Sequence, residues 1–254
     1  MPQAIRVLGI MLALGAASAA PAKPKPEAPV GTRIPRDLEL SPLPEARATL
    51  SDFARCAVRK RRDLAVQFIL DTKINVADQY LKLADPKCMM GVADRIDADV
   101  YLTLPRDIMR FAIAEALMRA DLGSFDPALI KLAQPLQYST LDPADYVPKP
   151  GKKYKPKELA ELQEAKVIDQ ARIAFQRYGE CVARNEPLNV RLLTFSKPDS
   201  IDEVAALKAL MPKFSDCLTA GQQFKTNKTM MRGTLALAYY RLARAPRATV
   251  ATAK

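Results

Sequence analysis

The sequence predicts an all-α fold of two tandem helical repeats of about four helices each, with one disulfide stapling each repeat and a Pro/Lys-rich linker joining them. Three observations support this. Residues 178–184 echo residues 53–59, with a cysteine near the centre of each segment. A second cysteine follows in both halves, and residues 231–241 align without a gap on residues 109–119. A repeat of this kind determines the architecture before any single element is considered.

The N-terminus has the organisation of a cleavable signal peptide, assigned to residues 1–22. Arg6 precedes a short apolar run over residues 7–14, and small residues in an A-x-A pattern follow. The run is too short to cross a bilayer, because a spanning helix takes roughly 20 apolar residues. We therefore expect a periplasmic or secreted protein whose mature chain has no membrane span.

The first repeat is assigned to residues 46–121, after a leader (residues 23–45) that is expected to be disordered because it is rich in proline and lacks apolar periodicity. Within the repeat, apolar residues recur with the three-then-four spacing of amphipathic helices. The expected helices lie near residues 50–59, 64–69, 76–83 and 109–120.

The second repeat is assigned to residues 158–245, and we expect each repeat to close its own core. A long amphipathic helix opens it near residue 157, and helices follow over residues 188–193, 201–214 and 231–242. Residues 122–157 form a linker or a long strap across the surface, and residues 246–254 are expected to be a disordered tail.

The four cysteines are expected to form two disulfides, because export places them in an oxidising compartment. Four cysteines allow three connectivities. If each repeat is one folding unit, the pairs are Cys56–Cys88 and Cys181–Cys217. The competing interpretation is metal binding, but no C-x-x-C spacing occurs, and the absence of histidine excludes a mixed Cys/His zinc site.

The chain lacks the catalytic residues and motifs that several large classes of enzyme use. Without histidine there is no Ser/His/Asp or Cys/His arrangement, and no glycine-rich phosphate loop occurs. Glu115 interrupts the apolar run of a predicted helix, but Leu237 stands at the equivalent position of the second repeat. We interpret Glu115 as solvated or paired, and expect no catalytic residue, cofactor or metal.

The formal net charge is +11, and two clusters carry much of the excess. The first repeat contributes Arg55, Arg59, Lys60, Arg61 and Arg62, and the linker contributes Lys149, Lys152, Lys153, Lys155 and Lys157. A solvated surface is the simpler interpretation, and an anion-binding site is the alternative. The second repeat lacks the first cluster, so folding of the unit does not require it.

Three pairs of arginines recur at equivalent positions of the two repeats. They are Arg59 and Arg184, Arg110 and Arg232, and Arg119 and Arg241. Paired arginines can line a groove for an acidic partner, because the guanidinium fork suits carboxylate and phosphate. We favour local pairing along the helices, because residues shared by two diverged copies are those that the unit needs to fold.

The Cys-x-x-Arg segments at Cys56 and Cys181, the second cysteines and the Met-Arg closing helices resemble predicted secreted proteins of unknown function from proteobacteria. The resemblance covers residues 46–120 and 165–243 and implies an exported helical protein without a known activity.

We therefore expect a non-enzymatic binding or scaffold protein of the cell envelope, whose partner is an unknown protein or an anionic surface. One alternative is a basic binder of anionic envelope polymer or nucleic acid, although the aromatic residues that stack on single strands are few. Another is an inhibitor or immunity-type protein. An enzyme that uses Glu115 ranks last.

Overall fold

The computed structural model describes residues 44–72, 82–85, 87–88, 106–219, 224 and 226–247. This part of the chain is mostly helical and contains no β-strand, which confirms the predicted all-α class. The expected signal peptide lies outside the described residues, as does the leader apart from Pro44 and Glu45, which begin a helix. Most of the helix expected over residues 76–83 also lies outside them.

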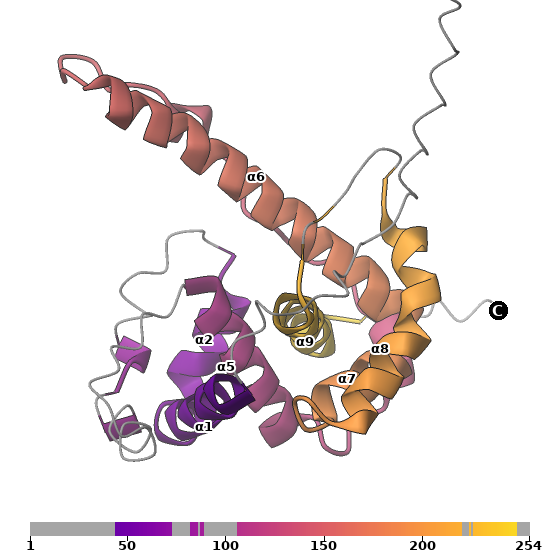
Figure 1. The fold of residues 1–254 in the computed structure, drawn as a ribbon. Helices are drawn as coiled ribbons and strands as arrows, with labels where there is room; N and C mark the ends of the chain where they lie inside the picture. Colours follow the sequence, from indigo (N-terminus) through magenta and orange to yellow (C-terminus); the bar gives the residue numbers. More distant parts are fainter. Residues whose placement is uncertain are drawn as a thin grey trace, which may run out of the picture.

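Two helices from opposite halves of the chain form the centre of the fold. They are α5 (Arg106–Asp121) and α9 (Lys228–Arg244), which make the most extensive helix–helix contact in the described structure. Helices α1 (Pro44–Lys60) and α2 (Arg62–Leu70) pack on α5 (Figure 1). These elements confirm the helices expected near residues 50–59, 64–69 and 109–120.

The second half places its helices around α9. Helix α6 (Pro156–Asn185) packs its C-terminal part on α9, α7 (Pro187–Phe195) joins it there, and α8 (Ile201–Phe214) packs mainly on α7. A 3₁₀ turn, η3 (Ser215–Cys217), follows α8 directly. Proline occupies the first turn of α6 and of α7, where its missing N–H leaves no hydrogen bond unmade.

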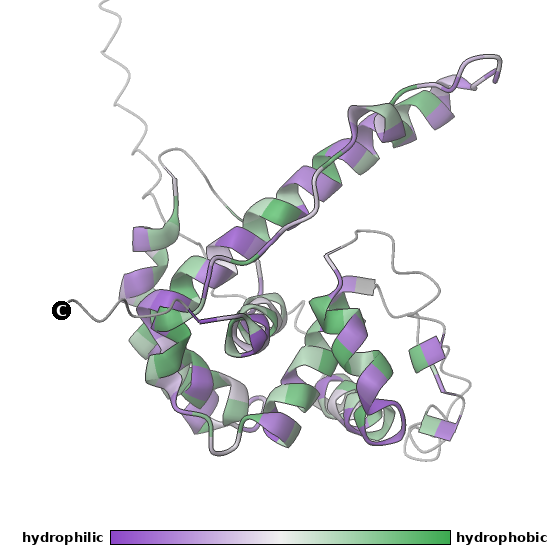
Figure 2. Cartoon of the chain, turned by 180° about the vertical axis from the view of Figure 1, so that it is seen from behind, coloured by the Kyte–Doolittle hydropathy of each residue, from purple (hydrophilic) through white to green (hydrophobic). Residues whose placement is uncertain are grey.

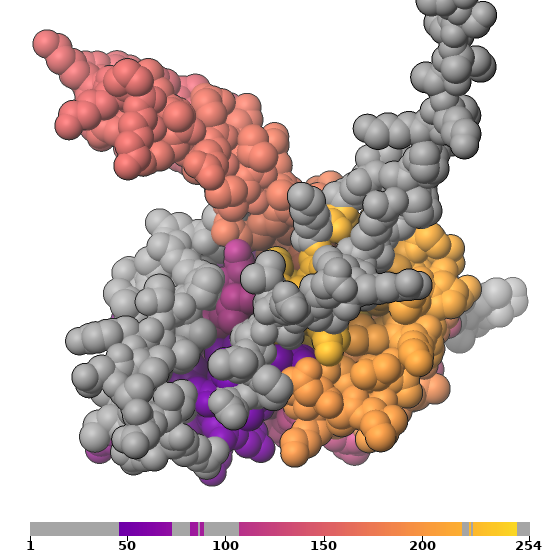
Figure 3. Space-filling view, in the orientation of Figure 1, coloured from indigo at the N-terminus to yellow at the C-terminus, as the bar shows by residue number. Residues whose placement is uncertain are grey.

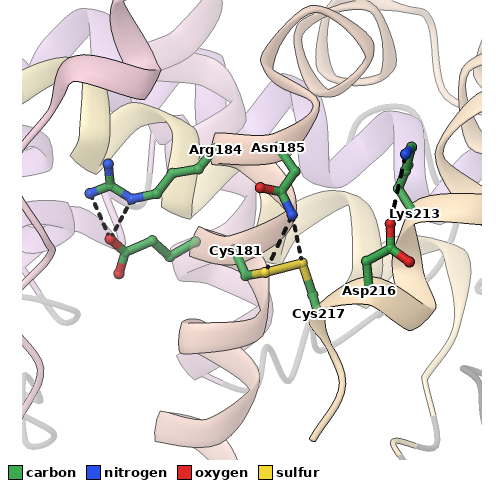
Figure 4. Close-up of a disulfide and its surroundings, with 7 residues drawn as sticks. Cys181, Arg184, Asn185, Lys213, Asp216 and Cys217 are labelled. Atoms are coloured by element: carbon green, nitrogen blue, oxygen red, sulfur yellow. Dashed lines mark hydrogen bonds and ion pairs between the residues drawn. A yellow bond between two sulfur atoms is a disulfide. The ribbon is translucent and has the colours of Figure 1, made fainter.

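Both predicted disulfides are present. Cys56 and Cys88 have their Cα atoms 5.6 Å apart, and the Cα atoms of Cys181 and Cys217 are 5.7 Å apart. The second bond ties α6 to η3, and the Asn185 amide nitrogen lies 3.5 Å from the sulfur of Cys217 (Figure 4). Disulfides of this kind are compatible with a secreted or periplasmic protein.

The buried apolar residues form one continuous core, so the expectation of a separate core for each half is wrong. The reason lies where α5 meets α9. A Cβ atom at Gly233 would overlap the Phe111 side chain, so the glycine lets the two helices approach closely. These positions are equivalent in the alignment of the halves. Two phenylalanines would not fit where these equivalent positions meet, and the chain has glycine at one of them.

Residues 122–155, called the strap here, run back along α6 (Figure 2). The strap contains two short 3₁₀ helices, η1 (Pro127–Leu132) and η2 (Pro143–Tyr146). It is held to α6 by hydrogen bonds, such as that from the Tyr146 hydroxyl to Asp169 at 2.8 Å. Of the two expectations for this segment, a strap across the surface therefore describes its course.

The N-terminal part of α6 and the strap residues beside it, which include η2, project from the body as an arm (Figure 3). Helix α6 has 30 residues, which corresponds to about 45 Å at the helical rise. None of the helices in the described ranges has the length and apolar character needed to cross a membrane.

The first two residues of the expected disordered tail are paired instead. The carbonyl of Pro246 accepts from the N–H of Gln134 at 2.8 Å, and Arg247 forms an antiparallel bridge with Ala133. Strap residues 133 and 134 thus contact both α6, through Arg184, and the segment that follows α9. The remaining tail residues, 248–254, lie outside the described residues.

Candidate anion-binding site

Two members of the first basic cluster line a pocket beside the Cys56–Cys88 disulfide. Arg55 and Arg59 lie one turn apart on α1, so they share a face of that helix. Together with Lys87 and Arg119 they line a pocket of about 570 Å³, called the Arg59 pocket here. The fold thus brings together cations from α1, from the residues before Cys88 and from α5.

The other three members lie outside this pocket. Lys60 is 3.5 Å from Asp85, and the Arg62 guanidinium lies 2.8 Å from Asp121, whose hydrogen bond and charge raise the pKa of Arg62. Arg61 is exposed between α1 and α2. The solvated or locally paired interpretation therefore describes these three side chains, whereas Arg55 and Arg59 face a cavity.

The positive charge of the pocket is only partly neutralised. Asp52 is the one acidic side chain among its described lining residues, and it pairs with Arg55. Arg59 forms no hydrogen bond or ion pair with any described residue. Arg119 donates to the carbonyls at the end of α7, and burial followed by the charge of Arg232 lowers its pKa. Such a concentration of positive charge attracts anions.

The second basic cluster gathers at the tip of the arm. All of its members are exposed there: Lys149, Lys152, Lys153, Lys155 and Lys157. Lys157 lies 3.8 Å from Glu161, and the Lys152 ammonium lies 4.7 Å from the centre of the Tyr154 ring. These lysines come just before and at the N-terminal end of α6, the end that projects away from the other helices (Figure 1).

The equivalent arginines Arg110 and Arg232 each hold a helix end. Arg110 donates to the carbonyls of Ile69 and Asp71, at the C-terminal end of α2. Arg232 donates to the carbonyls of Thr194 and Ser196, both at 2.9 Å, at the C-terminal end of α7. Residues 69 and 71 align with residues 194 and 196, so both arginines stabilise the same point of their half. This agrees with the structural interpretation.

Glu115 is paired, which was one of the two expectations for this residue. Its carboxylate accepts from Arg232 at 2.7 Å, and Arg232 is only 1% exposed. Arg232 also donates to Glu203 at 3.0 Å, and Glu203 accepts from Arg47 at 2.7 Å. The sequence alone does not reveal Glu203 as a buried ionic centre, because its partners Arg232 and Arg47 lie 29 and 156 residues away in the chain.

Glu180 is a buried side chain that holds the strap, and nothing in its immediate sequence marks it as such. Its carboxylate accepts from the N–H of Leu136 at 3.1 Å, from the Tyr138 hydroxyl and from Arg184 at 2.8 Å. The available signal was the alignment of the halves, in which Glu180 stands opposite Arg55. Because the flanking residues match, this reversal of charge indicates that Glu180 and Arg55 contact different groups.

Within the described ranges, no group of three histidine, cysteine, aspartate or glutamate residues could hold a metal ion. Comparison of this chain with protein-family models, with curated proteins and with solved structures found no match.

Proposed function

We propose that this chain is an exported, non-enzymatic binding protein of the cell envelope that captures an anionic partner in the Arg59 pocket. The observation that carries the proposal is the convergence of Arg55, Arg59 and Lys87 on one cavity in which Arg59 has no described partner. Like charges held close together raise the free energy of the site, and a bound anion relieves this repulsion. Export rests on the signal-like N-terminus and fits the two disulfides.

We further propose that residues 46–121 and 158–245 are two copies of one helical unit. Equivalent cysteines form the disulfides, and Arg110 and Arg232 hold equivalent carbonyls. If the halves are copies, positions that match serve folding, and positions that differ are free to serve function. Among the lining residues of the pocket, three differ in charge sign from their counterparts: Asp52 stands opposite Arg177, Arg55 opposite Glu180, and Lys87 opposite Asp216.

The lysine tip of the arm supports a second candidate function, which is attachment to an anionic surface. Its five exposed side chains lie in the turn before α6 and in the first turn of that helix, a suitable position for contact with a polymer or another protein. We rank it second because exposed lysines without a cavity are also the ordinary composition of a solvated surface.

One experiment separates the two sites. The double variant Arg59→Ala/Lys87→Ala and the double variant Lys152→Ala/Lys153→Ala each remove two exposed positive charges, so each is the control for the other. We would measure the Kd for a fluorescent heparin fragment, used as a polyanionic probe, at two salt concentrations. The pocket variant should bind about tenfold more weakly and flatten the salt dependence by about two units of slope.

Both variants should keep the melting temperature of the unaltered chain, because exposed charges contribute little to stability. If only the arm variant loses affinity, the second candidate replaces the first. If neither variant changes the Kd or its salt dependence, the proposed function is wrong.

A further inference from the structure

The second half of the molecule has a peptide segment where the first half has the Arg59 pocket. In the second half, residues 133–138 of the strap lie against four side chains: Arg177, Glu180, Arg184 and Arg241. In the alignment of the halves, these four positions correspond to Asp52, Arg55, Arg59 and Arg119, which all line the pocket. The second half therefore contains a counterpart of the Arg59 pocket that is occupied by the strap.

The contacts in the second half are those of an extended peptide. Arg184 donates to the carbonyls of Ala133 at 2.7 Å and Gln134 at 2.8 Å. Glu180 accepts from the backbone N–H of Leu136 at 3.1 Å and from the Tyr138 hydroxyl. Backbone carbonyls, one backbone N–H and one side chain are thus recognised together.

The ring of Tyr138 completes the recognition of the strap. The guanidinium carbons of Arg177 and Arg241 both lie 5.5 Å from its centre, within the range of cation–π attraction. Burial, followed by the hydrogen bond and charge of Glu180, raises the pKa of Tyr138, so its hydroxyl stays protonated and donates. The second-half site therefore selects a residue that offers a hydrogen-bond donor.

The first half also has an arginine at the position of Arg184, which binds carbonyls, but it has a residue of opposite charge at the position of Glu180, which binds the tyrosine. Arg59 takes the position of Arg184 and is unpartnered among the described residues, whereas Arg55 replaces Glu180. An arginine at this position offers donors only, so the side chain that it receives must be an acceptor. Arg119 does not carry over its counterpart's contact, because it is already bonded to the end of α7.

We infer that the Arg59 pocket binds an extended acidic peptide segment of a partner protein. The backbone carbonyls of the segment accept from Arg59, and an aspartate or glutamate lies against Arg55 and Lys87. Arg55 shares its charge with Asp52, but its side chain is 60% exposed, so it can turn toward a second carboxylate. The inference rests on the proposed function and adds the class of partner and the mode of recognition.

The strap itself supplies the probes. A labelled peptide with the sequence of residues 131–140 carries the native tyrosine at position 138, and a second peptide carries Tyr138→Glu. Fluorescence polarisation should show that the unaltered chain binds the glutamate peptide about tenfold more tightly than the tyrosine peptide, as expected for a charge-assisted hydrogen bond. No measurable preference between the two peptides would overturn the inference.

The variant Arg55→Glu recreates the second-half site and should reverse this preference. Its matched control is Arg61→Glu, which makes the same charge change at an exposed position outside the pocket and should preserve the preference. Both positions are exposed, so circular dichroism and melting temperature should be unchanged. A preference for glutamate that survives in Arg55→Glu, or one that is equally lost in Arg61→Glu, contradicts the inference.

A composition-matched peptide distinguishes this inference from simple anion binding. It carries the glutamate at the position of Gln134 and a glutamine at position 138, so only the order differs. Weaker binding of this peptide supports register-specific recognition. If both glutamate peptides bind equally while heparin binding still depends on Arg59 and Lys87, the pocket binds anions without reading a peptide. If heparin binding is also independent of these two residues, the proposed function fails as well.

Discussion

At the scale of single residues, the buried charges of this protein are distinguished by their partners. Arg232 has two carboxylates, Glu115 and Glu203, within 3.0 Å. Among the described residues, Arg110 is hydrogen-bonded to backbone carbonyls alone and its Nε atom has no hydrogen-bond partner. Burial lowers the pKa of Arg110 to about 10. The ion network of Arg47, Glu203 and Arg232 therefore joins distant parts of the chain, whereas Arg110 holds one helix end.

Replacement of Glu203 should be strongly destabilising. Glu203→Gln leaves the guanidinium groups of Arg47 and Arg232 buried without this carboxylate, and breaking a buried ion pair costs about 3–5 kcal/mol. Urea unfolding at neutral pH would measure this loss. The control is Asp202→Asn, which removes an exposed acid in the same helical turn and should cost less than about 1 kcal/mol.

The same residue predicts a pH dependence. Burial alone would raise the pKa of Glu203, but the hydrogen bonds and charge of Arg47 outweigh it and lower the pKa below the usual range. The stability from this lowered pKa is present above the unfolded-state pKa of about 4.3 and is lost as the pH falls through the folded-state value. The free energy of unfolding should therefore fall less steeply with acid in Glu203→Gln. An equally steep decline in the variant would mean that other carboxylates control acid unfolding.

At the scale of elements, the sequence predicted the helices, because local apolar periodicity determines them. The helices around Cys56 and Cys181 and the two closing helices are present, since their apolar spacing and the repeat specify them. The course of the strap could not be predicted in the same way. It depends on contacts such as those of Glu180 with Leu136 and Tyr138, which are 44 and 42 residues away and leave no periodic pattern.

The same division applies to the candidate site. The sequence identified Arg55 and Arg59 as a basic cluster, because their charges lie close together in the chain. It did not separate them from Lys60, Arg61 and Arg62. Tertiary packing decides which side of α1 faces the pocket and which cations meet an acidic partner, as Arg62 meets Asp121. Of the five basic residues of this cluster, Arg55 and Arg59 therefore line the pocket, whereas Lys60, Arg61 and Arg62 lie on the surface outside it.

The closest approach of α5 and α9 gives a prediction for these two helices. Gly233→Ala should destabilise the protein by about 1–3 kcal/mol, because the new Cβ atom would overlap the side chain of Phe111. Gly123→Ala is the control, because nothing lies within 4 Å of the added atom at that position. Thermal unfolding of the two variants would measure the difference. Equal melting temperatures would show that α5 and α9 can separate slightly without loss of packing.

At the scale of the whole molecule, the continuous core makes the two halves depend on each other. Helices α5 and α9 are each the closing helix of one half, and they bury much of their surface against one another. The similarity between residues 53–59 and 178–184 and between residues 109–119 and 231–241 does not show how the two halves pack against each other. Burial of equivalent apolar faces against each other removes more apolar surface from water than two isolated small cores would.

This coupling predicts a single unfolding transition for the described helices. Replacing Cys181 and Cys217 together with serine removes the disulfide of the second half, which should lower the free energy of unfolding by about 3–4 kcal/mol. Hydrogen exchange should then show that amides of α1 and α5, in the first half, lose as much protection as those of α9. The reciprocal variant, without Cys56 and Cys88, should reduce protection in α9 equally. If α1 and α5 keep their original protection when only the second disulfide is removed, the halves unfold separately and the α5–α9 contact does not couple them.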